Sequence, residues 1–289
     1  MNIALTGSAG LIGSKLLLDL QNMGHEVLCI SSSKSSQEDN IFLYEEVKSK
    51  ELNFNVDFIL HLASINSNLT ELEIHQEVEL IKKVTSSMDA LDCKNIIFFS
   101  TIKVYGENSF DFTLIDESFN QNPECFYGKA KAKCERLLKE LSHEMKFNYL
   151  IFRMPPVLIN HPKSNLGKLF QLVEKGIPIP SFKVGDINQR SFLSYDLLAY
   201  VLKIILNKGT IPLSQTFNLS DSEPTSTNAL LKRFAKSINK KPRIIYLPKF
   251  LFKSMIRINR LQLVLCRLFG NFHISNAKLK KEFKIPEHF

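Results

Sequence analysis

The segment TGSAGLIG, Thr6–Gly13, decides the fold of this chain. It follows the apolar run Asn2–Leu5 and precedes a stretch of helical period. In a strand–turn–helix unit, Gly7 allows a tight turn, Gly10 lets the backbone approach a pyrophosphate, and Gly13 lets helix and strand pack closely. The helix start then points unpaired N–H groups at the phosphates. The segment therefore predicts a dinucleotide-binding turn; a glycine-rich turn without a ligand is the alternative.

Short apolar runs alternate with longer stretches of helical period along the first half of the chain. This alternation is typical of βαβ units, so we expect an α/β fold of the Rossmann type, a doubly wound parallel sheet with a smaller C-terminal module. After Pro156 the alternation becomes irregular. The expected strands are Asn2–Leu5, Glu26–Ile30, Ile41–Tyr44, Asp57–Leu62, Asn95–Ser100 and Tyr149–Met154, and the long helices are Thr70–Leu91 and Glu124–Met145.

Composition excludes several classes of protein. The chain has 289 residues, of which 44% are hydrophobic, and this is enough for a large buried core. Its five cysteines are scattered and form no CxxC pair, so we expect neither a disulfide framework nor a metal site. No uncharged apolar run approaches the roughly 18 residues that span a bilayer, and the N-terminus enters a strand at once. A cytoplasmic protein is therefore expected.

The charge of the chain is unevenly distributed. The formal net charge is +8, yet residues 228–289 contain 15 Lys and Arg against 2 acidic residues. Such a region predicts attraction to a polyanion or to an anionic membrane surface. Within it, residues 250–270 are basic and apolar at helical spacing. This stretch can lie on a membrane surface, but we favour packing of its apolar face inside the protein.

Tyr127 and Lys131 form a candidate catalytic pair, because the spacing YxxxK places both side chains on one helix face. A tyrosine has a reference pKa of about 10, and a neighbouring ammonium stabilises its phenolate for proton transfer near neutral pH. An exposed tyrosine and lysine on an amphipathic helix are the alternative interpretation. Thr101 comes at the end of an expected strand upstream of Tyr127, and its hydroxyl can bond to the substrate oxygen that Tyr127 protonates.

Several segments together resemble one enzyme family. In order and spacing the chain is similar to the extended short-chain dehydrogenase/reductases, the NAD-dependent epimerase/dehydratase family that acts on nucleotide sugars. Within that family it resembles bacterial 4-reductases and 4-epimerases of UDP-N-acetyl-6-deoxyhexoses that are used for surface polysaccharides such as O-antigen. The segments that carry the resemblance are TGSAGLIG, DFILHLA (57–63), FFSTIKVYGE (98–107), YGKAK (127–131), FRMPP (152–156), NQRSF (188–192) and TFNLS (216–220).

The resemblance implies a domain division and a set of site residues. Residues 1–156, with 189–210 returning to them, would form the NAD(P)-binding Rossmann domain, and 157–188 with 211–289 the substrate-binding module. The implied catalytic triad is Thr101, Tyr127 and Lys131. The residues implied at the cofactor are Gly7, Gly10, Leu11, Ile12, Gly13, Leu62, Ala63 and Lys131, and those implied at the substrate are Thr101, Lys103, Asn165 and Arg190.

The chain departs from the family pattern at two informative places. Many relatives carry an acidic residue at the end of the second strand, where this chain has Ser31 and Ser32 followed by Lys34. Hydroxyls and a lysine can bind a 2′-phosphate that an acid would repel, so we expect NADP(H), with NAD(H) as the alternative. Glu77 stands where the family usually has an asparagine near the active site. It either alters the proton path or lies on the helix surface.

These features predict an oxidoreductase that reduces the C4 ketone of a UDP-4-keto-6-deoxy-N-acetylhexosamine. A UDP-sugar 4-epimerase of the UDP-glucose or UDP-GlcNAc type would use the same triad and is the first alternative. A non-catalytic dinucleotide- or RNA-binding protein on the same fold is the alternative from another class. We expect a UDP-sugar substrate, a homodimer through the helix Glu124–Met145, weak association with a membrane surface, and no nucleic acid.

Overall fold

The computed structural model describes residues 1–33, 41–49, 55–65, 69–106, 110–111, 113–162, 164–212, 214–287 and 289. The chain divides into two compact units. The first comprises Met1–Gly106, Asn120–Met154 and Leu198–Phe217, and the second comprises Glu107–Phe119, Pro155–Leu197 and Asn218–Phe289. These bounds differ from the expected ones, because the returning segment is 198–217 where 189–210 was expected. Residues 107–119 also join the second unit, in which their short strand β6 pairs with β13.

A seven-stranded sheet forms the centre of the first unit, in the order β11-β7-β5-β4-β1-β2-β3. In the part of this order that runs from β7 to β3, every two neighbouring strands are parallel. This confirms the predicted Rossmann-type sheet. The strand order reverses beside β1, and in such sheets ligands bind at the carboxyl ends of the strands at this point. The strands are β1 Asn2–Thr6, β2 Glu26–Ser31, β3 Ile41–Leu43, β4 Phe58–His61, β5 Asn95–Thr101, β7 Asn148–Met154 and β11 Gln215–Asn218.

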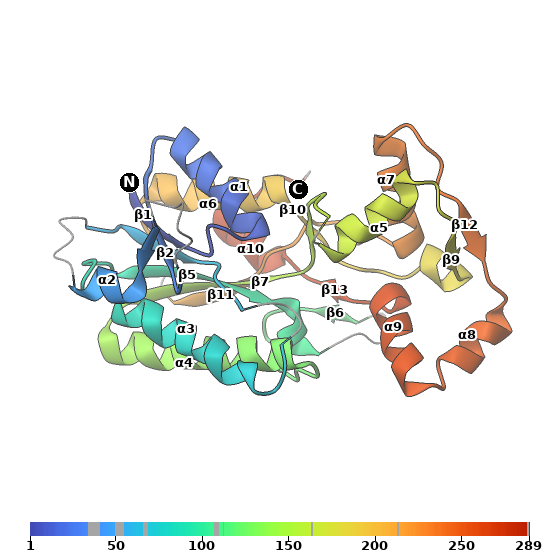
Figure 1. Ribbon diagram of the computed structural model, residues 1–289, viewed down its shortest axis with the longest axis horizontal. Helices are drawn as coiled ribbons and strands as arrows, with labels where there is room; N and C mark the ends of the chain where they lie inside the picture. The colour runs from blue at the N-terminus through green and yellow to red at the C-terminus, as the bar shows by residue number, and fades with distance from the viewer. Residues whose placement is uncertain are drawn as a thin grey trace. The chain divides into compact units, whose positions relative to one another are not determined.

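Helices cover both faces of this sheet (Figure 1). Helices α1 (Leu11–Asn22) and α6 (Tyr195–Lys208) lie on one face, and α3 (Glu73–Ser86) and α4 (Phe126–Met145) lie on the other. Short α2 (Tyr44–Ser49) follows β3, and the 3-10 helix η1 (Ile102–Tyr105) follows β5. Apolar side chains from the sheet pack against α3 and α4 in a continuous core, which includes Ile96, Ile151, Val84 and Leu138.

The second unit is built from short strand pairs and helices around small cores. One core contains Val173, Ile179, Leu231 and Ala235, and another contains Phe182, Leu265 and Phe269. The strand pairs are β8 Val157–Leu158 with β10 Leu193–Ser194, β9 Ile179–Ser181 with β12 Ile244–Tyr246, and β6 Leu114–Ile115 with β13 His273–Ile274. The helices are α5 Asn165–Glu174, η2 Lys183–Asp186, α7 Thr227–Ser237, α8 Lys249–Met255, α9 Asn259–Phe269 and α10 Ala277–Phe283.

Candidate active site

The glycine turn between β1 and α1 has no room for side chains. Gly7 has a φ of +76°, and a Cβ there would lie 2.7 Å from the backbone nitrogen of Ala63. A Cβ on Gly13 would lie 2.0 Å from the carbonyl oxygen of Gly7. At the start of α1, Gly10 offers no side chain to cap the first-turn N–H groups. The turn therefore combines a close backbone approach with N–H donors open to an anion, and this fits the pyrophosphate of a dinucleotide.

A buried hydrogen-bond chain fixes the end of β4 beside this turn. The Ala63 N–H donates to Thr6 Oγ1 at 3.1 Å, and the distance from Thr6 Oγ1 to His61 Nδ1 is 2.7 Å. Burial, together with the Lys131 ammonium, lowers the pKa of His61 to about 3, so the imidazole is neutral. A neutral Nδ1 can accept the threonine proton. His61 is therefore a structural residue that holds Leu62 and Ala63 at the turn.

Ser31 and Ser32, on which the prediction of NADP(H) binding is based, lie at the end of β2. Ser31 is partly buried, and its Oγ accepts the N–H of Ser33 at 3.3 Å. Ser32 is exposed, and Lys34 lies outside the described residues. The hydroxyls are therefore close to solvent at the carboxyl end of β2, and the choice between NADP(H) and NAD(H) stays a prediction.

Close packing of α4 against η1 places Tyr127 beside the end of β5. A Cβ on Gly128 would lie 2.6 Å from the carbonyl oxygen of Lys103, so the helix can approach this closely only with glycine. The Nζ atoms of Lys103 and Lys131 each lie 5.9 Å from the centre of the Tyr127 ring. Thr101 ends β5 directly before η1, and its Oγ1 accepts the N–H of Lys103 at 3.4 Å. The structure thus gathers these predicted residues on one side of α4; sequence reasoning missed Gly128.

Glu77 on α3 forms a buried ion pair with Lys131. The distance from Lys131 Nζ to Glu77 Oε1 is 2.9 Å, and both side chains are only 2% exposed. The other carboxylate oxygen accepts the N–H of Ile65 at 2.8 Å. Glu77 therefore does not lie on the helix surface, which was one of the two interpretations of this departure. It neutralises the cation that the sequence assigned to catalysis.

This ion pair acts on the protonation of both predicted catalytic groups. Burial alone would lower the pKa of Lys131, but the negative charges of an ionised Tyr127 and of Glu77 outweigh it and raise that pKa. Burial raises the pKa of Tyr127; the Lys131 ammonium lowers it, and Glu77 raises it again. Glu77 is the counter-charge of the Lys131 ammonium as long as Tyr127 is neutral, and burial together with Glu77 favours the protonated form of Tyr127. A protonated tyrosine is suited to donate a proton.

A second buried ion pair fixes α4 to the sheet and was not foreseen from the sequence. Arg153 Nη2 lies 2.7 Å from Glu135 Oε2, and Arg153 Nη1 donates to the Tyr105 hydroxyl at 2.9 Å. Ser100 Oγ donates to Glu135 Oε1 at 2.6 Å. These bonds join β7, α4, η1 and β5. They fix the strand end that carries Thr101 relative to the helix that carries Tyr127.

Of the two predicted substrate contacts in the second unit, the structure describes the side chain of Arg190 only. Arg190 Nη1 donates to the carbonyl oxygens of Gly270 at 3.0 Å and Cys266 at 3.4 Å, so it binds the carboxyl end of α9. Asn165 is the first residue of α5, and its side chain lies outside the described part of the structure. Their predicted roles at a diphosphate are not tested by these contacts.

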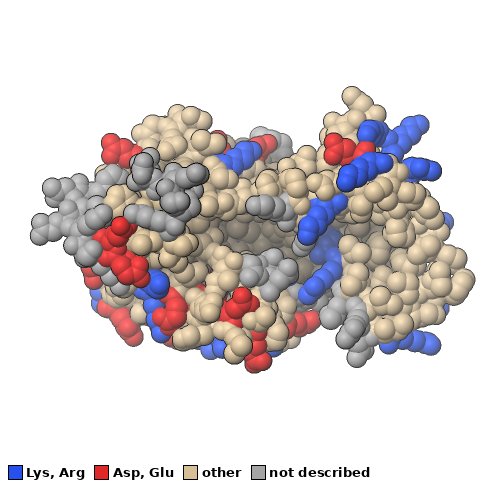
Figure 2. All heavy atoms as spheres, viewed as in Figure 1, with Lys and Arg blue, Asp and Glu red and all other residues tan. Residues whose placement is uncertain are grey.

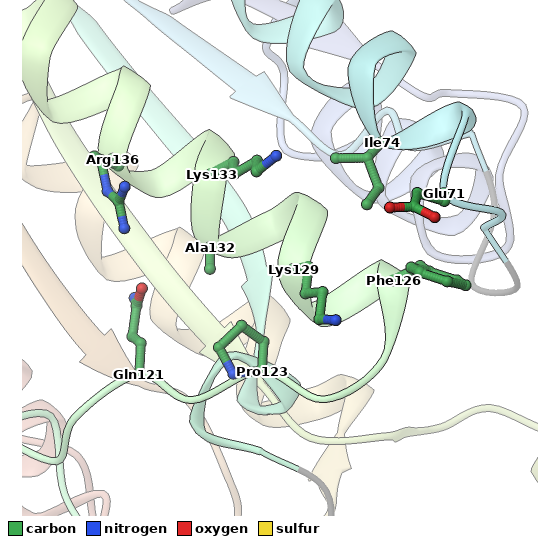
Figure 3. A pocket seen from close by; sticks show the side chains of 9 residues that line it. All are labelled: Glu71, Ile74, Gln121, Pro123, Phe126, Lys129, Ala132, Lys133 and Arg136. Atoms are coloured by element: carbon green, nitrogen blue, oxygen red, sulfur yellow. The ribbon is translucent and has the colours of Figure 1, made fainter.

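A surface hollow of about 290 Å³ lies beside α4 (Figure 3). Most of the α4 residues that line the hollow follow one another at intervals of three or four, which places them together on one side of the helix. Helical spacing places Tyr127 and Lys131 on the other side of this helix. The hollow therefore does not belong to the candidate active site. Its lining residues are Glu71, Ile74, Gln121, Pro123, Phe126, Lys129, Ala132, Lys133 and Arg136.

Comparison with known proteins agrees with this fold. Residues 3–219 match the NAD dependent epimerase/dehydratase family, so the chain belongs to this family of enzymes, as its motifs indicated. It is therefore an extended short-chain dehydrogenase/reductase.

Two curated relatives and one solved structure are informative. The chain is 26% identical to the UDP-glucose 4-epimerase of Vibrio cholerae, over 99% of this chain and 91% of that protein. It is 23% identical to the N-acetyl-alpha-D-glucosaminyl-diphospho-ditrans,octacis-undecaprenol 4-epimerase of Escherichia coli O157:H7, over 86% of this chain and 75% of that protein. The UDP-glucose 4-epimerase of Thermus thermophilus in complex with NAD has the same fold, with a TM-score of 0.73 and 18% identity over 99% of this chain and 94% of that chain.

Proposed function

We propose that this enzyme oxidises and reduces C4 of a diphosphate-linked sugar, and that it does so as a 4-epimerase. The observation that carries the proposal is the grouping of Tyr127 and Lys131 with the end of β5, where Thr101 lies. Both curated relatives described above are named as 4-epimerases. A UDP-sugar is the first substrate to test, and a sugar on a polyprenyl diphosphate, as in the second relative's name, is the next.

Each residue has a proposed role in this reaction. Tyr127 removes the proton from the C4 hydroxyl and later returns it, while Thr101 holds that oxygen by a hydrogen bond. The ammonium of Lys131 stabilises the phenolate of Tyr127 between these steps. When bound, the nicotinamide cofactor takes up and returns the hydride of C4. Lys103, Asn165 and Arg190 remain the proposed contacts of the diphosphate sugar.

The proposed cofactor contacts come from three turns of the first unit and from α4. Around the pyrophosphate we propose Gly7, Gly10, Leu11, Ile12 and Gly13, and at the ribose Leu62, Ala63 and Lys131. The hydroxyls of Ser31 and Ser32 support NADP(H), whereas the solved relative contains NAD. Titration of the purified protein with both cofactors separates the two: an affinity for NADPH at least tenfold above that for NADH supports NADP(H), and the reverse order supports NAD(H).

A 4-reductase of a 4-keto sugar is the second candidate function, and Glu77 is the observation that favours it. An epimerase must first use Tyr127 as a base, whereas a reductase uses it only as an acid. Glu77 opposes the Lys131 ammonium and raises the pKa of Tyr127, so the acid form is favoured. This electrostatic arrangement supports proton donation to a C4 carbonyl.

One pair of assays separates the two candidates. An epimerase converts UDP-glucose or UDP-GlcNAc into the C4 epimer without net consumption of cofactor. A reductase consumes one NADPH for each UDP-4-keto-6-deoxy-GlcNAc reduced. Tyr127→Phe should lower either rate by a factor of about 10²–10⁴ because it removes the proton carrier. Full activity of this variant would contradict the role proposed for Tyr127, whereas a wild-type protein without activity in both assays would favour a dinucleotide- or RNA-binding protein.

We further propose that two copies associate through α3 and α4 as a homodimer in the cytoplasm. The hollow of Figure 3 lies on the outer face of these helices, where Lys129 and Lys133 stand near Glu71. Opposite charges on one face can pair across a two-fold axis. Sedimentation of Lys133→Glu should show monomers if α4 is the interface, and an unchanged dimer would exclude this face.

A further inference from the structure

Helices α8 and α9 pack on the second unit through one apolar face. Leu251, Phe252 and Met255 lie against the core that contains Phe182 and Phe269. The ring centres of Phe182 and Phe252 are 5.0 Å apart in an edge-to-face arrangement. This inward face is the packing that the sequence predicted for residues 250–270. Contacts with this core therefore hold both helices on the second unit.

The outward face of the same two helices is also apolar. Phe250 is 65% exposed, Ile258 54%, Val264 50% and Leu268 41%. Val264 and Leu268 are one helical turn apart on α9 and share a helix face. Ile258 lies between the two helices. Four large apolar side chains from one short segment thus face solvent, which is unusual for a surface that meets only water.

The sequence around these side chains is basic and contains no acidic residue. From Pro224 to Lys281 the chain has 14 Lys and Arg and no Asp or Glu. Lys249, Lys253 and Arg257 are all exposed and follow one another at intervals of four, beside Phe250. Figure 2 shows tan and blue atoms and no red over the described part of α8 and α9. The surface is therefore apolar and positively charged at once.

We infer that the outward face of α8 and α9 docks on an anionic lipid bilayer. Aliphatic and aromatic side chains can enter the boundary between headgroups and acyl chains, while lysine and arginine lie among anionic headgroups. A single strand of nucleic acid would use the cations and stack on Phe250, but would leave Ile258, Val264 and Leu268 in water. A second copy would bring the same positive charges together, which disfavours self-association through this face.

This contact is peripheral. Among the described residues, none of the helices is long and apolar enough to cross a membrane. With several basic residues near the surface, binding should depend on anionic lipid and weaken with salt. The docking surface goes beyond the proposed function, because it lies outside the predicted catalytic residues.

Vesicle sedimentation tests the inference. The full-length protein should sediment with vesicles that contain phosphatidylglycerol, much less with pure phosphatidylcholine, and less in high salt. Each basic residue near an anionic surface changes the partition coefficient about fivefold, so the triple variant K249Q/K253Q/R257Q should bind about 100-fold more weakly. The control K94Q/K203Q/K208Q removes three exposed charges from the first unit and should bind as the wild type does.

The apolar contribution is tested separately. Phe250→Ser with Val264→Ser should lower binding at least tenfold while leaving the salt dependence in place, because the cations remain. Circular dichroism of each variant shows whether it is folded, and a Lys253→Glu variant keeps the test available if the serine pair does not fold.

The inference would be overturned by no sedimentation of the wild type with anionic vesicles, by equal loss of binding in the control triple variant, or by binding to RNA with no binding to lipid. Loss of a dimer in Phe250→Ser, without lipid binding, would identify a second copy as the occupant and also overturn it. Activity on a soluble sugar nucleotide is measured independently. A failure of the proposed function therefore leaves the vesicle result standing, and the reverse also holds.

Discussion

Replacing Glu77 with glutamine should show how much the buried ion pair with Lys131 contributes to the free energy of unfolding. The two charges are 2.9 Å apart, and both side chains are 2% exposed. At an effective dielectric constant of ~20, unit charges at this distance attract each other by about 6 kcal/mol. Part of that attraction offsets the cost of removing both ions from water. Because glutamine leaves the Lys131 ammonium buried without a counter-charge, we expect the free energy of unfolding to fall by about 3–5 kcal/mol.

Chemical denaturation at neutral pH without cofactor measures this loss, and the same helix offers a matched control. Glu79 lies further along α3 and pairs with Lys82 at 2.7 Å, but the two side chains are 37% and 53% exposed. Glu79→Gln should therefore lower the free energy of unfolding far less than Glu77→Gln does. If both substitutions lower the free energy of unfolding equally, burial does not strengthen the Glu77 ion pair and the reasoning is refuted. In a Lys131→Met background, Glu77→Gln should no longer lower the free energy of unfolding and should raise it, because Glu77 is then a buried charge without a counter-charge.

The same variant should shift the pH dependence of catalysis in a defined direction. Glu77 raises the pKa of Tyr127, so glutamine at position 77 should bring that pKa down. Reduction of a C4 ketone needs the protonated tyrosine, and its rate should then begin to fall at a lower pH than in the wild type. Oxidation of a C4 hydroxyl needs the phenolate, and its rate should rise at a lower pH. A shift of either profile to higher pH would contradict this assignment.

The glycine turn, the buried imidazole of His61 and the ion pair of Glu135 with Arg153 lead to three more predictions. Gly13→Ala should abolish dinucleotide binding in a fluorescence titration and lower the free energy of unfolding by about 1–3 kcal/mol, because its Cβ would lie 2.0 Å from a carbonyl oxygen. The control Gly24→Ala, at φ +81° in open space, should lower it by about 1 kcal/mol and leave binding intact. Between pH 6.5 and 3, His61 takes up a proton in the unfolded chain but not in the folded protein, because its folded pKa is depressed to about 3. The free energy of unfolding should therefore fall by up to about 1.4 kcal/mol for each pH unit below 6.5. His61→Asn should flatten that slope in acid denaturation, and an unchanged slope would contradict this assignment. Glu135→Gln should cost about 3 kcal/mol in urea unfolding because it leaves a buried guanidinium unpaired, and a cost below about 1 kcal/mol would contradict this.

Local sequence signals predicted the parts of the molecule that local interactions determine. The glycine turn, the parallel strands and the long helix that contains Tyr127 all follow from spacing over a few residues. The expected strand Ile41–Tyr44 ends one residue early, because Tyr44 begins α2 and buries its ring in the core. The expected helix Thr70–Leu91 is shorter, Glu73–Ser86. Both differences lie at element ends, where local preferences are weakest and packing decides.

The partners of buried charges could not be predicted in this way. Glu77 and Lys131 are far apart in the sequence and meet only because α3 packs against α4. Glu135 and Arg153 likewise meet through the packing of α4 on β7. The resemblance to the family identified position 77 as a departure, but a carboxylate at an asparagine position has no defined partner until the helices are placed. An acidic residue on the apolar side of an amphipathic helix was the one available signal that a buried cation faces it.

The ion pair explains how a glutamate can occupy the place of an asparagine without disrupting the site, and what it changes. A buried carboxylate needs a counter-charge, and Lys131 supplies one at 2.9 Å. The net positive charge near Tyr127 is therefore smaller than it would be with a neutral asparagine at position 77. Ionisation of Tyr127 must then depend more on any further positive charge, such as that of an oxidised nicotinamide. In this enzyme, the difference in the pKa of Tyr127 between the oxidised and reduced cofactor complexes should therefore be larger than in the Glu77→Asn variant. A spectroscopic titration of tyrosinate in the four complexes would measure this difference, and equal differences in the two proteins would mean that Glu77 holds Lys131 in place without controlling the proton.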